Sequence, residues 1–236
     1  MYLLGVISNK SVMERSDLLR NSAVKSMKNK FGRASVLILD RIAWILRHGN
    51  DNDNHILPHL INHCANLQAL KDLGATEIVG LNSTGSLKNK LRPGMIVIPD
   101  DFITLTATPT IHQNSAVHIT PSLDEKVRQK LIKAAFDSKI KVVNKGTYWQ
   151  TQGPRLETKA EIKMMANYAD IVGMTMANEA VIALELDLPY ASVCSIDNFG
   201  NGLLKKPLNM KEIIAGTRKN ADLMIRLLQN YLKLYS

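Results

Sequence analysis

Several polar residues of this chain stand where an apolar stretch ends, and their types suit the binding of an anion. The apolar run 42–47 ends in Arg47, which His48 follows directly. An arginine presents a planar fork of donors that suits phosphate or carboxylate, and an adjacent histidine adds a donor whose charge depends on pH. An isolated Arg-His-Gly triplet is more often a surface ion pair beside a solvated histidine, so this pair needs support from other positions.

A second polar group comprises Asn82, Ser83 and the residues up to Ser86. A turn of this composition lets backbone N–H groups surround an anion, although an ordinary turn contains the same residue types. Thr175 adds a further hydroxyl, and Met174 before it offers an apolar wall to a sugar face or simply fills the core. The pattern thus indicates an anion site beside an apolar surface.

Two further places suit a heterocyclic base. Glu157 follows Gly153-Pro154-Arg155 and can accept hydrogen bonds from N–H groups, or it can stabilise the start of a helix through the helix dipole. Asp197 and Asn198 end another apolar run, where either can bind a base edge or form an ordinary Asx turn. A base, a sugar and an anion could therefore share one composite site.

The elements that must position these residues are short Val- and Ile-rich runs alternating with helical patterns. The predicted strands are residues 2–7, 34–40, 42–47, 77–83, 94–99, 140–150, 169–174 and 189–196, and the predicted helices are 59–73, 122–138, 158–168, 177–187 and 209–234. The alternation predicts an α/β fold: one domain over residues 1–236, with a mixed, largely parallel central sheet flanked by helices. Residues 34–40 and 42–47 are expected to form a tight antiparallel pair.

The polar groups described above all fall just past predicted strands. Ligands gather at the carboxyl edge of such sheets, so this coincidence is the strongest indication in the sequence of a single active site.

Composition excludes several other classes of protein. No apolar run is long enough to span a bilayer, and the N-terminal apolar stretch is too short for a signal peptide. Cys64 and Cys194 lie in apolar surroundings without CxxC spacing, which indicates buried reduced thiols of a cytoplasmic protein and no metal site. The net charge of +9 is spread along a chain with only 5% aromatic residues, which favours small anionic substrates over nucleic acid as partners.

Taken in order, these segments resemble the trimeric purine nucleoside phosphorylase and methylthioadenosine phosphorylase family. The matching stretches are "RHG", "INHCANLQALKDLGATEIVGLNSTGSL", "LRPGMIVIPDDFI", "GPRLETKAEI" and "DIVGMTMANEAVIALELDLPYAS", and the resemblance covers about residues 42 to 202. It implies phosphorolysis of a purine nucleoside to the free base and a pentose 1-phosphate. It further implies inorganic phosphate as co-substrate with no other cofactor, and a homotrimer or dimer of trimers.

The resemblance also implies a role for each candidate residue. The residues expected at the phosphate are Arg47, His48, Asn82, Ser83 and Thr175, with Lys10 or Ser11 substituting for a family "GGTG" loop that this chain lacks. The residues expected at the nucleoside are Met174 at the ribose, Glu157 and Asn198 at the base, His118 towards the 5′ substituent, often across a subunit boundary, and Leu156 in place of a usual Phe. Among these, His48, Glu157 and Asn198 are the expected catalytic residues. Either Asn54 or His55 occupies the position of a further family histidine.

The resemblance leaves the base preference open, so three functions remain in competition. The carboxylate of Glu157 and the amide of Asn198 suit a 6-oxopurine, as in inosine, guanosine or 5′-methylthioinosine. Asp197 stands one residue before Asn198, and a shift of one residue would put an acid where adenine-specific members have theirs. The alternatives are therefore a methylthioadenosine phosphorylase acting on a 6-aminopurine and a non-catalytic nucleoside binder.

Overall fold

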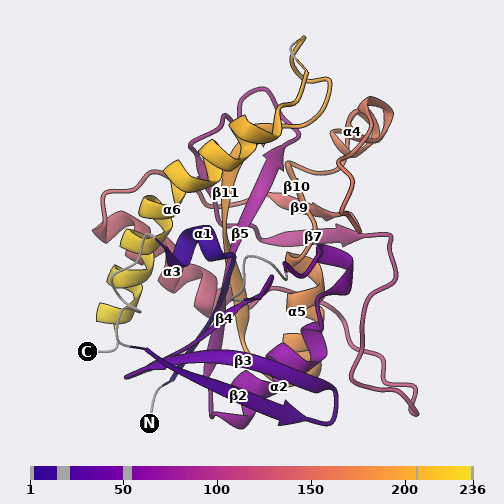
Figure 1. The fold of residues 1–236 in the computed structure, drawn as a ribbon. Helices are drawn as coiled ribbons and strands as arrows, with labels where there is room; N and C mark the ends of the chain where they lie inside the picture. The colour runs from indigo at the N-terminus through magenta and orange to yellow at the C-terminus, as the bar shows by residue number, and fades with distance from the viewer. Residues whose placement is uncertain (1–2, 15–21, 50–54, 206, 235–236) are drawn as a thin grey trace.

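The computed structural model describes residues 3–14, 22–49, 55–205 and 207–234, and their strands form an eleven-stranded mixed sheet (Figure 1). The strands are β1 (Leu4–Ser8), β2 (Ala23–Asn29), β3 (Gly32–Leu39), β4 (Ile42–Leu46), β5 (Glu77–Ser86), β6 (Ile96–Val97), β7 (Asp101–Thr104), β8 (Val142–Val143), β9 (Thr147–Gln150), β10 (Ile171–Gly173) and β11 (Tyr190–Phe199). The helices are α1 (Lys10–Met13), α2 (His63–Asp72), α3 (Glu125–Asp137), α4 (Lys159–Met165), α5 (Met176–Glu185) and α6 (Met210–Lys233), with a short 3-10 helix at Pro58–Leu60. The predicted α/β class with a mixed sheet is confirmed.

The long strand β5 is the axis of this sheet. On one edge it pairs in parallel with β11 along nearly its whole length. On the other edge it pairs in parallel with β1 as far as Gly80, and then in antiparallel fashion with β10 from Gly85. The sheet therefore parts beside the middle of β5. The predicted antiparallel pair is also confirmed, because β3 and β4 pair from Val36 with Ile45 to Leu39 with Ile42.

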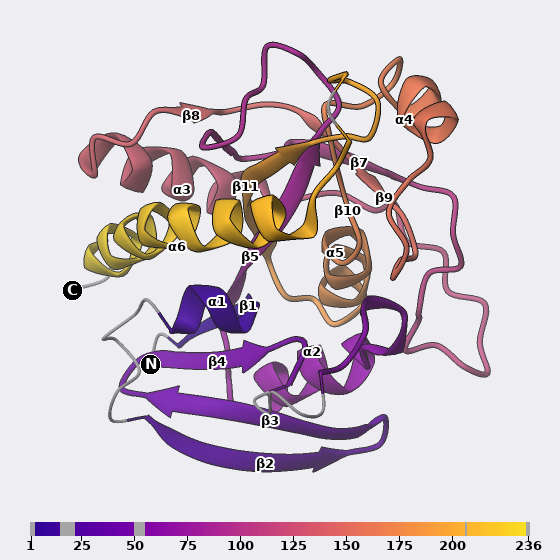
Figure 2. The same ribbon diagram turned by 45° about the horizontal axis from the view of Figure 1, so that its top comes forward.

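Helices α3 and α6 pack on one face of the sheet and α2 and α5 on the other (Figure 2), each pair over an apolar layer. Successive residues of a strand point to opposite faces, so Val6 joins the core formed with α3 and α6, whereas Ile7 joins the core formed with α2 and α5. A smaller cluster around Trp149 and Ile162 anchors α4. Strands β5 and β11 contribute residues to both layers, and α5 belongs to the layer on the face of α2.

One predicted strand is wrong in its extent. Residues 140–150 form two strands rather than one: β8 pairs with β6, and β9 pairs with β7 and β10. Gly146 lies between them with a φ of 157°, and its N–H donates to Asp100 Oδ1 at 2.8 Å. The bend lets the chain pass from one part of the sheet to the other.

Three elements were not predicted from the sequence: β2, β7 and α1. Strand β2 is the outer strand of the hairpin with β3 and is mostly exposed, so it lacks the apolar run that marks a buried strand. Strand β7 has one exposed and three half-buried residues, and α1 contains only one buried residue, Val12. Elements that bury little apolar surface leave little signal in a sequence.

Candidate active site

A cavity of about 190 Å³ lies beside the middle of β5, between the residue where its pairing with β1 ends and the residue where its pairing with β10 begins. It lies at the carboxyl ends of β1 and β4, which stop side by side at Ser8 and Leu46. The lining residues are Asn9, Arg47, His48, Pro58, Ser83, Thr84, Gly85, Leu156, Glu157, Val172, Gly173, Met174, Thr175, Asn198, Gly200, Leu208 and Ile213. Most of the residues singled out from the sequence thus meet in one place.

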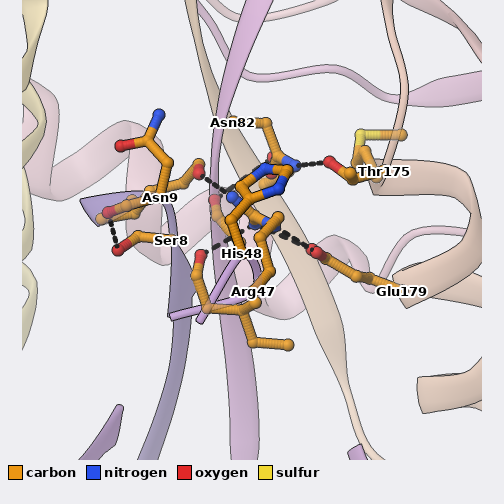
Figure 3. Close-up of polar contacts among 12 residues, drawn as sticks. Ser8, Asn9, Arg47, His48, Asn82, Thr175 and Glu179 are labelled. Atoms are coloured by element: carbon orange, nitrogen blue, oxygen red, sulfur yellow. Dashed lines mark hydrogen bonds and ion pairs between the residues drawn. The ribbon is translucent and has the colours of Figure 1, made fainter. Parts of the chain in front are cut away.

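The guanidinium of Arg47 spans the gap in the sheet (Figure 3). It donates to the carbonyl oxygens of Ile7, at the end of β1, and Leu81, in β5, at 3.0 and 2.8 Å. It also donates to both carboxylate oxygens of Glu179. Burial opposes the charge of the guanidinium, but the attraction and hydrogen bonds of Glu179 outweigh burial and raise its pKa. Arg47 therefore supplies a fixed positive charge at the floor of the cavity.

His48 beside it is neutral around pH 7. Burial is the main cause that lowers the pKa of the imidazole to about 4, and the charge of Arg47 acts in the same direction. Nδ1 lies 2.8 Å from the carbonyl oxygen of Ile56, and the ring stacks on His55 with 4.7 Å between the centroids. The neutral ring donates through Nδ1 to Ile56, so Nε2 carries the lone pair. His55 thus supports His48, whereas Asn54, the alternative, lies outside the described residues.

The predicted turn at residues 82–86 is wrong, because β5 continues through Ser86. Both edges of β5 find partners there, β11 on one side and β10 on the other, so the backbone stays extended. Ser83 lines the cavity, but Asn82 does not; its amide donates to Thr175 Oγ1 at 2.9 Å. The structure therefore brings Ser83 and Thr175 to the cavity and places Asn82 behind Thr175.

The N-terminal loop contributes a residue that sequence reasoning missed. Asn9 lines the cavity, whereas Lys10 and Ser11 form the first turn of α1 and are not among the lining residues. Asn9 caps α1 by accepting from Val12 N at 3.0 Å. Ser8 accepts from Trp44 Nε1 at 2.8 Å and so fastens the loop to the sheet. The sequence did offer a signal for Asn9, because it is a common helix-capping residue that directly follows an apolar run.

Asn198 pairs with Gly85, further along β5 than Leu81, to which Arg47 donates, and Glu157 lines the same cavity. Glu157 is buried at 7% exposure, and Thr151 Oγ1 donates to its Oε1 at 2.7 Å. It precedes α4, whose capping box is formed by Thr158 and Glu161, so Glu157 is not the carboxylate of the helix start. Its second carboxylate oxygen can therefore serve a ligand.

Asn198 rests against Gly85, where a Cβ atom would come within 3.2 Å of Asn198 Nδ2. Its amide donates one N–H to the Phe199 carbonyl at 2.8 Å. Met174 and the half-exposed Leu156 add apolar surface to the cavity lining. The arrangement presents an acceptor and an amide beside an apolar wall.

Asp197 is turned away from the cavity. The pairing of β11 with β5 shifts between Ile196 and Asn198, so Asp197 is the extra residue of a bulge. Its carboxylate accepts from Ser83 Oγ, from Thr217 Oγ1 at 2.7 Å and from Asn220 Nδ2 at 2.7 Å. Burial raises the pKa of this carboxyl, and the hydrogen bonds act against that rise. The Asp197 carboxylate is thus bound by Ser83 of β5 and by two residues of α6, and Asn198 lines the cavity instead.

Four residues depart from the sequence expectations in other ways. His118 is exposed and is not among the lining residues of the cavity. Glu179, fully buried, was not singled out, although the single acid of the largely apolar stretch 176–184 was a usable signal. Leu208, just before α6, and Ile213, in its first turn, were also missed; they carry no chemistry that marks them in a sequence.

Within the described ranges, no group of three or more His, Cys, Asp or Glu residues is arranged to hold a metal ion. No helix among them is long and apolar enough to cross a membrane. Both cysteines are free, as predicted, but only Cys194 is buried; burial raises its thiol pKa to about 12, and Cys64 is partly exposed. The polar groups of the cavity are therefore the chemistry that the site offers.

Comparisons with known proteins agree with this geometry. The chain matches the model of the phosphorylase superfamily over residues 14–233. It is 38% identical to a probable 6-oxopurine nucleoside phosphorylase of Archaeoglobus fulgidus, over 98% of this chain and 96% of that protein. It is 33% identical to a probable S-methyl-5′-thioinosine phosphorylase of Methanocaldococcus jannaschii, over 98% of this chain and 92% of that protein.

The fold is shared with a solved structure as well. Methylthioadenosine phosphorylase from Schistosoma mansoni superimposes with a TM-score of 0.88 at 24% identity, covering 100% of this chain and 92% of the other. A family match over nearly the whole length and relatives above 30% identity lead to one conclusion: the chain belongs to the phosphorylase superfamily.

Proposed function

We propose that this protein is a purine nucleoside phosphorylase, a pentosyltransferase that cleaves 6-oxopurine nucleosides with inorganic phosphate. The observation that carries the proposal is the arrangement within one cavity. Arg47 donates to Leu81 of β5, whereas Asn198 pairs with Gly85, further along the same strand. His48, Thr175 and Glu157 line the same cavity. Phosphate beside Arg47 and purine beside Asn198 would leave the ribose between them, against Met174.

The chemistry follows from that order. As the glycosidic bond lengthens, the ribose gains oxocarbenium character, as in glycoside hydrolysis. Phosphate held by Arg47 and Thr175 attacks the sugar and stabilises its positive charge. A proton of hydrogen phosphate can be donated to the lone pair of His48 Nε2. The bond forms between phosphate and ribose, and the purine leaves with the bonding pair. Catalysis consists of positioning and electrostatic preorganisation.

The base end favours a 6-oxopurine. N1 of such a base carries a hydrogen, so N1–H can donate a hydrogen bond to a carboxylate oxygen of Glu157. Asn198 can donate a hydrogen bond to N7 as negative charge builds on the leaving ring. Asp197, the residue that could have favoured a 6-aminopurine, has its carboxylate occupied by Ser83, Thr217 and Asn220. The substrates are therefore inosine, guanosine and 5′-methylthioinosine rather than methylthioadenosine.

The apolar residues Leu208 and Ile213 of the same cavity suit an uncharged 5′ substituent such as methylthio. We place no cofactor in the reaction beyond phosphate as co-substrate, and we assign residues 1–236 to one phosphorylase domain of a cytoplasmic protein. Its partners are these small-molecule substrates, and we assign it neither a nucleic acid nor a membrane as a partner.

Assembly into a homotrimer, or a dimer of trimers, belongs to the same proposal. Large apolar side chains at Leu57, Leu60 and Leu105 are exposed in the isolated subunit, and Leu57 and Leu60 flank Pro58, which lines the cavity. A neighbouring subunit would cover them, and it could bring His118 to the 5′ end of the nucleoside. Light scattering coupled to size exclusion should give three or six times the mass of 26.3 kDa; a monomer would remove this part of the proposal.

The test of the reaction is purine release from inosine, guanosine, 5′-methylthioinosine and 5′-methylthioadenosine, each with and without phosphate. Phosphate-dependent cleavage of the three 6-oxopurine nucleosides is the expected result. Preference for methylthioadenosine would reverse the assignment of the base, and the absence of turnover with all four would indicate a nucleoside-binding protein.

A further inference from the structure

The hydroxyl of Thr175 has a fixed direction. Thr175 is the N-cap residue of α5, yet its side chain makes no capping hydrogen bond. Its Oγ1 instead accepts from Asn82 Nδ2 at 2.9 Å (Figure 3). A threonine hydroxyl has one hydrogen, and an oxygen that accepts from an amide directs that hydrogen elsewhere. Because Thr175 lines the cavity, its hydrogen can be donated to an anion there.

The backbone N–H groups at the start of α5 have acceptors within the protein. The N–H groups of Thr175 and Met176 point to the Tyr148 hydroxyl at 3.2 and 3.4 Å. The N–H of Ala177 donates to Gln150 Oε1 at 2.7 Å. Anions commonly bind to such N–H groups at a helix start, but here strand β9 provides their acceptors. The hydroxyl hydrogen of Thr175 is therefore the donor that this residue can offer to an anion.

The amide of Asn82 is itself held in one orientation. Its Oδ1 accepts from Ser192 Oγ at 2.7 Å, so its Nδ2 faces Thr175. Asn82 and Ser192 are 1% and 0% exposed, and neither belongs to the lining residues of the cavity. Ser192, Asn82 and Thr175 thus form a chain of hydrogen bonds in which each hydrogen points towards the cavity.

We propose that Asn82 is a positioning residue that acts on the bound anion only through Thr175. It holds Thr175 Oγ1 as an acceptor and so makes the threonine hydroxyl a dedicated donor to phosphate. This inference rests on the proposed phosphate site, and it replaces the direct contact between Asn82 and phosphate that the sequence suggested. The chemical distinction is testable, because a residue that acts through another loses its effect when that other residue is removed.

The experiment is a double-mutant cycle on the full chain with Asn82→Ala, Thr175→Ala and the double variant. The dissociation constant of inorganic phosphate is measured by calorimetry. The phosphate KM and the kcat for inosine are then measured by steady-state kinetics. We expect the dissociation constant to rise roughly tenfold in T175A, which loses a hydrogen bond to a charged group. In N82A it should rise about three- to tenfold, because the Thr175 hydroxyl remains but is no longer held in direction. The double variant should bind phosphate as T175A does, within about a factor of two.

Two controls make the cycle specific. N82A combined with His48→Gln should give the product of the two single effects, because no hydrogen bond joins Asn82 to His48 among the described contacts. Ser86→Ala removes a buried hydroxyl from the same strand, outside the cavity lining, and should leave phosphate binding unchanged. Asn82→Ser serves as a second variant if N82A does not fold, as judged by circular dichroism.

A further weakening of phosphate binding by N82A in the T175A background, as large as in the wild type, would overturn the inference and restore a direct contact. The failure of the proposed reaction would look different, because the wild-type protein would then release no purine in the presence of phosphate. Calorimetry with phosphate alone tests the positioning role independently of turnover.

Discussion

Arg47 and Glu179 form a bidentate ion pair in the interior, with 2.6 Å from Nε to Oε1 and 3.1 Å from Nη2 to Oε2. Both side chains are almost fully buried, at 2% and 0% exposure, and the Tyr190 hydroxyl donates to the same carboxylate at 2.8 Å. The pair joins the end of β4 to α5 across the gap beside β5. It therefore both completes the fold and fixes the cation at the floor of the cavity.

Replacing Glu179 with Gln should destabilise the protein and weaken phosphate binding together. Removing one partner of a buried ion pair leaves the other charge uncompensated, which typically costs about 3–5 kcal/mol. Urea unfolding should show this loss, and the phosphate KM should rise because Arg47 loses its fixed direction. Asp137→Asn, which breaks the exposed pair with Lys133, is the control and should change the unfolding midpoint little. An E179Q variant as stable as the wild type would contradict the role assigned to the pair.

His48 should make stability depend on pH in a predictable direction. Its pKa falls from 6.5 to about 4 on folding, so the unfolded chain binds a proton in this interval and the folded chain does not. The wild type should therefore lose stability relative to His48→Gln as the pH falls from 6.5 to 4, by up to about 3 kcal/mol. His63, whose pKa is lowered to about 3, is present in both proteins and cancels. The measurement is urea unfolding of both proteins across this range; a constant difference would refute the burial of a neutral imidazole.

Glu157→Gln should separate substrates by their bases. Losing the carboxylate removes a charge-assisted hydrogen bond to N1–H, so kcat/KM for inosine should fall about 10- to 100-fold. Activity on adenosine, which has no proton on N1, should fall much less. Thr151→Val removes only the donor to Oε1 and should have a smaller effect on inosine. Equal losses on both nucleosides in E157Q would show that Glu157 does not bind the base.

Asp197 and Asn198 should differ in their effects although they are neighbours. Asn198→Asp places a charge beside the leaving purine, where negative charge builds up, so kcat for inosine should fall at least about tenfold. Asp197→Asn should keep the preference for 6-oxopurines, because this carboxylate is bound to α6. Steady-state kinetics with paired inosine and adenosine give the comparison. A change of base preference in D197N alone would place Asp197, and not Asn198, at the base.

Much of this site could be predicted because buried strands and the residues that follow them carry strong patterns. The run before Arg47 and the stretch before Thr175 are apolar and short, so the ends of strands, and hence the edge of the sheet, were visible. The sequence could not show that β5 continues through Ser86, since strand pairing on both edges overrides the turn propensity of its residues. It could not show which of Asp197 and Asn198 faces the cavity either, because a one-residue bulge decides which way each side chain points.

The roles of Asn82 and Glu179 also depend on contacts distant in the chain. Asn82 meets Thr175, and Glu179 meets Arg47, only after α5 has packed against the sheet. No local pattern encodes those distances, whereas residue type together with a place just after an apolar run was enough to mark Arg47 and Thr175 as candidates.

The central claim is that phosphate attacks the sugar while the purine leaves, and the products test it most directly. Inosine is incubated with the protein and phosphate, and the phosphorus-containing product is followed by 31P NMR while hypoxanthine is measured by absorbance. The account predicts one pentose 1-phosphate for each hypoxanthine released and no release without phosphate. Release of hypoxanthine with free ribose, at a rate independent of phosphate, would contradict it.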